Sequence, residues 1–451
     1  MSDAPNLSRL ISAGTDRRVI ATRDYTFPLD GFVRASSLGP SLMHLEARSV
    51  ILVVRDMAKA AAALIDLDGC ARRIVLCPPG WDVSRLASAA RDSDVDALVY
   101  DDEDAPPPIP VDVVARCGLP LRELNSPRPA SHETEWILPT SGTSGPPKLV
   151  VHTLRSLTGA IADAPPRLWA TFYDIRRYGG LQIFLRALSS RSSLYLGAVE
   201  ESVLSILARF GDVGVTHISG TPSHWRKVLM SGAGRRVDPD YVRLSGEIAD
   251  SALLSALRAL YPRAAIEHAY ASTEAGVVFA VNDGKAGFPA SWLERDGSVQ
   301  MKIVDGSLRV RSNWRAMRFL GENTSPLADE DGFVDTGDIV EWHGDRLYFV
   351  GRRGGIINVG GAKVHPEEVE AVLNAHAAVR ASRAFARTNS ITGALVFAEV
   401  VLRDEHRADA ACESDILGAC RARLPRHMVP AGLRFVSDLP ITEGGKLARR
   451  G

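Results

Sequence analysis

Residues 140–148, Thr-Ser-Gly-Thr-Ser-Gly-Pro-Pro-Lys, are the most informative stretch of this chain. Four hydroxyls, two glycines and a lysine fall in one short segment after residues 135–138, Glu-Trp-Ile-Leu. Glycine lets backbone N–H groups approach an anion closely, hydroxyls donate further hydrogen bonds, and a lysine adds a positive charge. The segment therefore predicts a turn that wraps phosphate oxygens.

This segment differs from the usual P-loop, G-x-x-x-x-G-K-[ST], which runs directly into a helix. Pro146 and Pro147 separate the last glycine from Lys148 and prevent an immediate helix. Taken alone, the segment also fits a solvated turn rich in serine, glycine and proline. Other motifs in the chain are needed to distinguish a phosphate-binding turn from a solvated one.

Four further motifs follow along the chain: Tyr270-Ala-Ser-Thr-Glu274, Asp335-Thr-Gly-Asp338, the run from Gly351 to Glu370, and Leu439-Pro-Ile-Thr-Glu-Gly-Gly-Lys-Leu447. Together with 140–148 they resemble, in order, the motifs of the adenylate-forming superfamily, which comprises acyl-CoA synthetases, peptide-synthetase adenylation domains and luciferases. The resemblance runs from about Trp136 to the C-terminus. Earlier residues contribute only a secondary-structure pattern.

Composition excludes several other classes of protein. Hydrophobic residues make up 45% of the 451 residues, which supports a sizeable core, and 53 basic against 54 acidic side chains argue against a nucleic-acid surface. No signal peptide or membrane span is predicted, which favours a cytoplasmic protein. Five cysteines without C-x-x-C spacing indicate buried, reduced thiols rather than disulfides or a zinc site.

The early residues alternate apolar runs with helical patterns. They predict strands at 49–54, 73–77 and 97–100, helices at 57–65 and 83–90, and an exposed acidic, proline-rich loop at 101–110. Apolar strands that alternate with helices are typical of a parallel sheet covered on both faces. The fold class predicted is therefore α/β.

Beyond the phosphate-loop segment, strand and helix signals resume and then shorten. The predicted elements are strands at 193–196 and 215–218, helices at 223–229 and 251–260, β segments at 299–304, 307–311 and 345–350, and an α+β unit with helices at 366–373 and 413–423 and strands at 395–401 and 433–436. We expect a large domain of parallel and mixed sheets with a small β region over 1–352 and a small, mobile α+β domain over 353–451. Relative to the superfamily, the N-terminal part is compressed.

Joining a carboxylate to AMP brings two anions together, so positive charge must gather at the α-phosphate. The resemblance implies that the phosphate loop binds the β- and γ-phosphates of ATP through Thr140, Ser141, Gly142, Thr143, Ser144, Gly145 and Lys148. It also implies that Thr273 contacts the α-phosphate and that Glu274 holds Mg²⁺, a cation that prefers oxygen ligands. The alternative for Thr273 and Glu274 is a helix cap at the surface.

The resemblance assigns the AMP and ribose to Asp338, Arg352, Gly246, Glu247 and Tyr270. Asp338 has the chemistry to accept bonds from both ribose hydroxyls. A turn-forming aspartate and a surface ion pair are the alternatives for Asp338 and Arg352.

Lys446 is implied to be the catalytic lysine that bridges the substrate carboxylate and the α-phosphate. In the superfamily the small domain then rotates for the transfer to a thiol. The hinge position falls on Gly354, where aspartate or lysine is usual. Gly360 and Gly361 resemble a strand that lines the pantetheine tunnel of CoA ligases, and a β-bulge at a sheet edge is the alternative.

The acyl pocket is predicted from Tyr178, Gly179, Gly180, Ala271 and Ser272. Ala271 stands where glycine is common, which narrows the pocket floor and disfavours a long chain. The pair Arg176-Arg177 occupies a segment where a ring is often found in relatives. One arginine would meet a second polar group of the substrate, or both would be solvated, and solvation is the preferred interpretation.

Together these features predict an ATP-dependent ligase that forms an acyl-adenylate and then a thioester with coenzyme A. The expected substrate is a small or medium acid, aromatic or short aliphatic, and Mg²⁺ is the expected cofactor. Two alternatives stay open: a stand-alone adenylation enzyme that loads a separate carrier protein, and a nucleotide-binding protein without catalysis.

Overall fold

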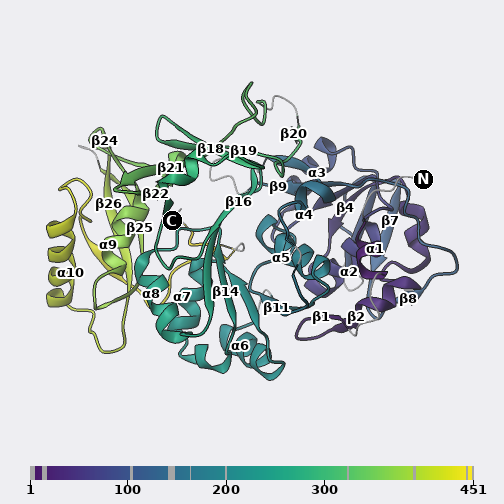
Figure 1. The fold of residues 1–451 in the computed structure, drawn as a ribbon, viewed down its shortest axis with the longest axis horizontal. Helices are drawn as coiled ribbons and strands as arrows, with labels where there is room; N and C mark the ends of the chain where they lie inside the picture. The colour runs from purple at the N-terminus through teal and green to yellow at the C-terminus, as the bar shows by residue number, and fades with distance from the viewer. Residues whose placement is uncertain are drawn as a thin grey trace.

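The structure is a computed structural model that describes residues 6–12, 18–101, 105–140, 148–162, 164–198, 201–321, 325–389, 393–442 and 445–448. Figure 1 shows two large sheets side by side with helices packed around them, a smaller sheet above them, and a C-terminal unit at the left. The helices described are α1 (Leu7–Ser12), α2 (Met57–Leu67), α3 (Val83–Asp92), α4 (Leu154–Thr158), α5 (Tyr178–Ser189), α6 (Val203–Asp212), α7 (Pro222–Met230), α8 (Ser251–Leu260), α9 (Pro366–Asn374) and α10 (Ala410–Arg423). This arrangement confirms the predicted α/β fold.

The first large sheet has the order β20-β10-β9-β5-β4-β6-β7 among the described residues. Its strands are β4 (Ser49–Val53), β5 (Arg73–Leu76), β6 (Ala97–Asp101), β7 (Val113–Cys117), β9 (Glu135–Pro139), β10 (Leu149–Thr153) and β20 (Arg318–Leu320). β4 pairs in parallel with both β5 and β6, so the predicted βαβαβ unit is confirmed. β9 and β10 pair antiparallel, so the chain reverses its direction across the phosphate-loop segment.

Alternate residues of these strands enter different cores, which explains their continuous apolar sequences. On β4, Val50 and Leu52 pack with helix α2, whereas Ile51 packs on the other face with Leu86 of α3. β4 is therefore buried on both faces.

The second large sheet has the order β16-β15-β14-β13-β11-β12-β1-β2. Its strands are β1 (Val19–Ala21), β2 (Thr26–Pro28), β11 (Leu168–Thr171), β12 (Ser193–Leu196), β13 (His217–Gly220), β14 (Tyr241–Ser245), β15 (Ala265–Ser272) and β16 (Gly276–Val281). The inner strands run parallel, and β2 and β16 close the two edges in antiparallel pairs. The predicted strand at 215–218 begins two residues later, at His217.

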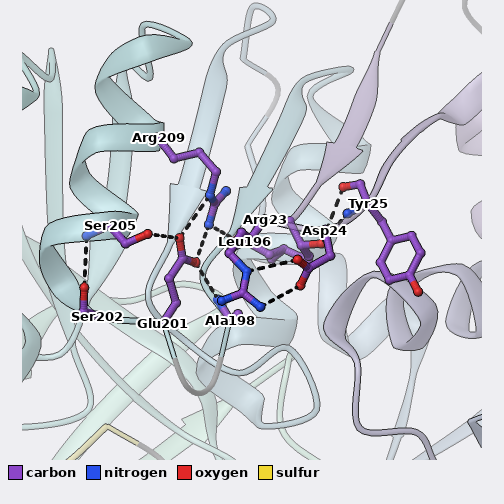
Figure 2. Close-up of polar contacts among 10 residues, drawn as sticks. Arg23, Asp24, Tyr25, Leu196, Ala198, Glu201, Ser202, Ser205 and Arg209 are labelled. Atoms are coloured by element: carbon purple, nitrogen blue, oxygen red, sulfur yellow. Dashed lines mark hydrogen bonds and ion pairs between the residues drawn. The ribbon is translucent and has the colours of Figure 1, made fainter. Parts of the chain in front are cut away.

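An ion pair fixes the start of α6 beside the end of β12, and Figure 2 shows it together with the neighbouring turn at Arg23 and Asp24. Glu201 accepts a hydrogen bond from Arg209 at 2.7 Å, while Arg209 also donates to the carbonyl of Leu196 at 2.9 Å. Burial acts to raise the pKa of Glu201, but the bonds from Arg209 lower it below its usual value. The ionised Glu201 and Arg209 therefore join the start of α6 to Leu196 at the end of β12.

Two smaller units complete the chain. The sheet β17-β22-β21-β19-β18 contains β17 (Phe288–Pro289), β18 (Val299–Val304), β19 (Ser307–Ser312), β21 (Val334–His343) and β22 (Arg346–Arg352), and its pairs are antiparallel as predicted. The C-terminal unit contains β23 (Ile357–Val359), β24 (Ala362–Val364), β25 (Val379–Asn389), β26 (Gly393–Leu402) and β27 (Leu433–Phe435). It has its own core, built on α9, α10 and the inner faces of β25 and β26.

The sequence patterns miss several elements, among them α5, β7, β14, β25 and the short pair β3 (Ala35–Ser36) and β8 (Arg122–Glu123). β25 carries Arg380, Arg383 and Arg387, which interrupt its apolar alternation. Arg383 is nevertheless buried in an ion pair with Glu399 at 2.7 Å on the neighbouring strand, so a charged residue occupies an inward position.

Candidate active site

The carboxyl ends of three neighbouring parallel strands lead into loops, two of which carry predicted site residues. β14 leads to the predicted residues Gly246 and Glu247, and β15 to the predicted Thr273 and Glu274. β13 leads to Thr221, which the sequence analysis did not single out. Ligands of open α/β sheets bind outside the carboxyl ends of the strands. The fold therefore places these loops at one edge, where a nucleotide is expected.

Most of the predicted phosphate loop, Ser141, Gly142, Thr143, Ser144 and Gly145, lies outside the described residues. At its ends, the N–H of Thr140 donates to the carbonyl of Lys148 at 2.8 Å. Lys148 is exposed, and its Nζ lies 5.1 Å from the centre of the Phe319 ring. The two flanking residues are thus held together, and the lysine lies at the surface.

Thr273 is held by His152, a residue that the motifs did not single out. The Nε2 atom of His152 lies 2.7 Å from the carbonyl oxygen of Thr273, and its Nδ1 atom lies 2.8 Å from the hydroxyl of Ser156. A carbonyl oxygen only accepts, so Nε2 carries the proton and Nδ1 accepts from Ser156. Burial lowers the pKa of His152 to about 4, so the ring is neutral near pH 7.

This link joins two motifs. His152 lies on β10, which follows the phosphate loop, and Thr273 directly follows β15. The bond therefore fixes the Thr273 peptide relative to the strand that leaves the phosphate loop.

Glu274 is a candidate magnesium ligand. Its carbonyl accepts from the N–H of Ala316 at 2.9 Å, which fixes the backbone, and its side chain is half-buried. Among the described residues no cluster of three or more acidic, histidine or cysteine side chains forms a metal cage. Mg²⁺ is usually bound by one or two carboxylates, with substrate phosphates and water completing its shell, so one glutamate beside a nucleotide suits this ion.

Asp338, on β21, is bonded at both oxygens. The phenol of Tyr270 donates to Oδ2 at 2.6 Å, and Nε of Arg352 donates to Oδ1 at 2.8 Å. Burial acts to lower the pKa of Arg352, but the charges of Asp338 and then of Glu274 raise it above its usual value. Three of the five residues assigned to AMP and ribose, Asp338, Arg352 and Tyr270, therefore form one bonded group.

Lys446 reaches this group from the C-terminal unit. A methyl group placed on Gly246 would lie 3.2 Å from Cε of Lys446, so the lysine side chain lies over this glycine. Burial lowers the pKa of Lys446; among the nearby charges, Glu247 and Asp338 raise it, and Arg352 and Arg177 lower it. The structure thus brings the predicted catalytic lysine to the predicted nucleotide residues.

Glu247 contacts protein groups in this structure. It accepts from the N–H and the hydroxyl of Ser223 at 2.8 and 2.9 Å, and from the N–H of Leu447 at 2.7 Å. The carboxylate therefore ties the lysine loop to the start of α7, a contact that sequence motifs do not reveal.

The predicted acyl-pocket residues have mixed surroundings. Tyr178 is buried at the start of α5, and Ala271 and Ser272 are half-buried at the end of β15. Gly180 has a packing role, because a Cβ there would lie 2.2 Å from the carbonyl oxygen of Asp174. A Cβ on Gly179 would be in ordinary contact, at 3.5 Å, with the ring of Tyr173.

The expectation that Arg176 is solvated is wrong. Its side chain is fully buried and donates to Asp174 at 2.7 Å and to the backbone carbonyls of Val54 and Arg55. The ion pair and the carbonyls compensate for burial of the charge. Arg177, the next residue, lies directly before α5. Of the pair Arg176-Arg177, it is the one whose charge lowers the pKa of Lys446.

Gly354 lies in an exposed turn, Arg353–Gly355, between β22 and β23. Gly360 and Gly361 form the tip of the β23–β24 hairpin with φ of +58° and +90°. Two-residue hairpin turns of this kind need positive φ at both positions, which glycine adopts without strain. The hairpin explains these glycines locally, and their role at a pantetheine tunnel stays a prediction.

The loops at one edge of the sheet carry the residues predicted to bind the nucleotide, and a lysine from the C-terminal unit lies against them. This arrangement is that of the adenylate-forming class. The sequence profile of the AMP-binding enzyme family matches residues 28–314, and that of the AMP-binding enzyme C-terminal domain matches 368–446. The chain belongs to the AMP-binding enzyme family. The match begins well before Trp136, so the family likeness includes the first sheet.

Named proteins are similar to about 70% of this chain. A 2-succinylbenzoate–CoA ligase of Bacillus cereus is 26% identical over 343 residues, which cover 70% of this chain and 69% of that protein. A probable acyl-activating enzyme 4 of Arabidopsis thaliana is 25% identical over 365 residues, 71% of this chain and 65% of that protein. The matches thus span about two thirds of the length of these relatives.

Among solved structures, an anthranilate CoA ligase in complex with anthranoyl-AMP superposes with a TM-score of 0.79 and 17% identity, covering 99% of this chain and 96% of that one. At this identity the likeness shows the fold. All five cysteines are unpaired, and four are buried as predicted, but the prediction of burial is wrong for Cys412, which is partly exposed. No helix in the described part of the chain has both the length and the apolar character needed to cross a membrane.

Proposed function

We propose that the protein is an AMP-forming acid–thiol ligase that makes an acyl-adenylate and then a coenzyme A thioester. The observation that carries this proposal is the position of Lys446. Its side chain lies over Gly246, close enough to Asp338 and Arg352 for their charges to act on it, although the lysine and these residues belong to different units of the chain. Asp338 and Arg352 are in turn bonded to each other, and Asp338 to Tyr270. The relatives named CoA ligase and acyl-activating enzyme support it.

In the first half-reaction, a carboxylate oxygen of the acid attacks the α-phosphorus of ATP and pyrophosphate leaves. Asp338 holds the ribose, and Lys446 offsets the negative charge that the carboxylate and the α-phosphate bring together. Mg²⁺ held by Glu274 would neutralise phosphate charge. Electrostatic stabilisation of this kind is the main contribution that a protein makes to phosphoryl-type transfer.

In the second half-reaction, the thiol sulfur attacks the acyl carbon and AMP leaves with the bonding electrons, so that a thioester forms. We propose that residues 1–352 and 353–451 act as two units and that the small unit turns about Gly354, which moves Lys446 away. Glycine tolerates the large change in backbone angles that such a turn requires.

The acid is proposed to be small or medium in size and aromatic. Ala271 on β15 would narrow the pocket floor. Tyr173, Phe172 and His224 form an aromatic group, with the ring centres of Phe172 and His224 5.5 Å apart, and the Tyr173 ring lies beside the predicted pocket residue Gly179. Relatives named for 2-succinylbenzoate and anthranilate act on aromatic acids, which supports this choice.

The test is product detection by mass spectrometry after incubation with ATP, Mg²⁺, coenzyme A and a library of carboxylic acids. We expect an acyl-CoA whose mass names the acid. Accumulation of acyl-AMP without acyl-CoA would replace coenzyme A with a carrier protein as the acceptor. No adenylate and no pyrophosphate with any acid would overturn the proposal in favour of a nucleotide-binding protein without catalysis.

A further inference from the structure

We propose that Glu247 and Thr221 are positioning residues that hold the C-terminal loop carrying Lys446 against the large unit, residues 1–352, during adenylate formation. We call these contacts the latch, and they break before thioester formation. This inference rests on the proposed function for its kinetic consequence. Its structural consequence, protection of the loop, can be measured without any substrate.

Glu247 forms the first half of the latch. Its Oε2 accepts from the N–H of Ser223, and its Oε1 accepts from the hydroxyl of Ser223 and the N–H of Leu447. Ser223 lies in the first turn of α7, whose N–H groups have no partner within the helix, and a carboxylate is favoured there by the helix dipole. The large unit thus fixes the carboxylate, and the carboxylate fixes the residue next to the catalytic lysine.

Thr221 forms the second half, on the other side of Lys446. Its hydroxyl donates to the carbonyl of Gly445 at 2.6 Å and also accepts from the N–H of His224 at 3.0 Å, where it caps α7. Gly445 approaches His224 so closely that a Cβ would lie 1.9 Å from the ring, and its φ is +70°. Only glycine fits this position, so the loop is seated at one place on α7.

Thr442 and Lys446, on the two sides of the loop, are bonded to each other. The N–H of Thr442 donates to the carbonyl of Lys446 at 2.7 Å, and the N–H of Lys446 donates to the hydroxyl of Thr442 at 3.2 Å. Arg383 of the small unit donates to the carbonyl of Ala448 at 2.8 Å. Bonds at Gly445 and Leu447 therefore position the lysine between them.

In this structure the carboxylate of Glu247 is bonded to protein groups, and its direct contact with AMP stays a prediction. Three donors from the protein already occupy its two oxygens. Its remaining effect on the site is its charge, which raises the pKa of Lys446 against the stronger effect of burial. The same carboxylate thus places the ammonium group and favours its charged form.

The kinetic test compares four proteins: wild type, Glu247→Gln, Thr221→Val and Thr221→Ser. Glutamine at 247 places an N–H₂ group against the N–H of either Ser223 or Leu447, and valine at 221 removes the hydroxyl. We expect ATP–pyrophosphate exchange to fall about 10- to 100-fold in Glu247→Gln and about fivefold or more in Thr221→Val. Thr221→Ser keeps the hydroxyl and should stay within about twofold of wild type.

Thioester formation from synthetic acyl-adenylate should change less than about twofold in all variants, because the latch is open in that step. Equal losses in both half-reactions would show that the residues merely support the fold and would overturn the latch. If Glu247→Gln raises the KM for ATP and leaves kcat unchanged, Glu247 acts in nucleotide binding, and this result would also overturn the latch.

The structural test is hydrogen exchange of peptides that cover residues 438–448 in the substrate-free proteins. Glu247→Gln and Thr221→Val should expose these amides faster than wild type and Thr221→Ser, while peptides from β4 and α2 keep their protection. Equal exchange in all four proteins would overturn the latch. If the wild type makes no adenylate with any acid but the loop is protected as described, the proposed function fails and the docking contact stands.

Discussion

The phenol of Tyr270 and the carboxylate of Asp338 are joined by a 2.6 Å hydrogen bond that connects two sheets. Tyr270 lies on β15 of the second large sheet, and Asp338 lies on β21 of the antiparallel sheet. Burial raises the pKa of Tyr270 well above its usual value, so the phenol remains a donor at every working pH. Asp338 is thereby oriented before any nucleotide arrives.

Removing this bond should weaken nucleotide binding. Tyr270→Phe keeps the ring, which stacks on Phe349 at 4.6 Å, but deletes the donor. A hydrogen bond to a charged group contributes about 1.5–3 kcal/mol, so we expect KM for ATP to rise about tenfold or more with a smaller change in kcat. Tyr348→Phe on β22, the strand that pairs with β21, is the matched control and should leave the KM for ATP unchanged. An unchanged KM in Tyr270→Phe would contradict a ribose role for Asp338 in this orientation.

Lys446→Ala should separate the two half-reactions. Without the ammonium group, pyrophosphate exchange should fall by about 100-fold or more, because a charge that acts on the transition state is lost. Conversion of preformed acyl-adenylate to thioester should stay close to wild type, since the lysine serves only the first step. Equal loss of both steps would count against a two-conformation mechanism.

The pH dependence of exchange should report the same lysine. Burial lowers the pKa of Lys446 below its usual value, so the ammonium loses its proton at a lower pH than a solvated lysine. The rate of adenylate formation should therefore fall as pH rises through this lowered pKa. In Lys446→Arg, whatever activity remains should stay flat over the same alkaline range, because arginine does not titrate there. An identical alkaline limb in both proteins would assign the titration to another group.

Local patterns were enough to predict part of this molecule. The βαβαβ unit from Ser49 to Asp101 follows from apolar strands that alternate with helical patterns, which need no distant information. Helix starts are equally local: Asp56 and Asp82 cap α2 and α3 through the N–H of the third following residue. Motif resemblance likewise marked Lys446 and Asp338, which the fold brings together.

The remaining features depend on partners far away in the chain. Arg176 is buried because carbonyls 121 and 122 residues earlier accept its donors, and no pattern around residue 176 contains that information. Glu247 meets Leu447 across 200 residues, and His152 meets Thr273 across 121. Such contacts decide the geometry of the site, but they appear only once the sheets are assembled.

The link from His152 to Thr273 predicts a positioning effect on catalysis. His152→Leu removes the donor to the Thr273 carbonyl while it keeps an apolar volume, and an unsatisfied buried carbonyl costs about 1–3 kcal/mol. We expect adenylate formation to fall about tenfold while the KM for the acid changes little. Ser156→Ala, which leaves the Nε2 bond in place, is the milder control. Equal effects of the two variants would show that the histidine acts through helix α4 rather than through Thr273.

Two buried histidines should make the fold sensitive to mild acid. Burial lowers the pKa of both His152 and His224 to about 4, against an ordinary value of about 6.5 in the unfolded chain. Between these values the unfolded state binds more protons, so the free energy of unfolding falls as pH drops from about 6.5 towards 4. Each histidine should cost about 2 kcal/mol at pH 5.

Urea denaturation at pH 7.5 and pH 5 measures this loss. In the double variant His152→Gln/His224→Gln the difference between the two pH values should shrink by several kcal/mol, whatever the absolute stability, because glutamine does not titrate. His406→Gln changes an exposed histidine and should leave the difference as in wild type. If the double variant loses as much stability between pH 7.5 and 5 as wild type does, the two rings are not the groups that take up protons on unfolding. The assignment of His152 as a neutral ring that donates to the Thr273 carbonyl would then be wrong.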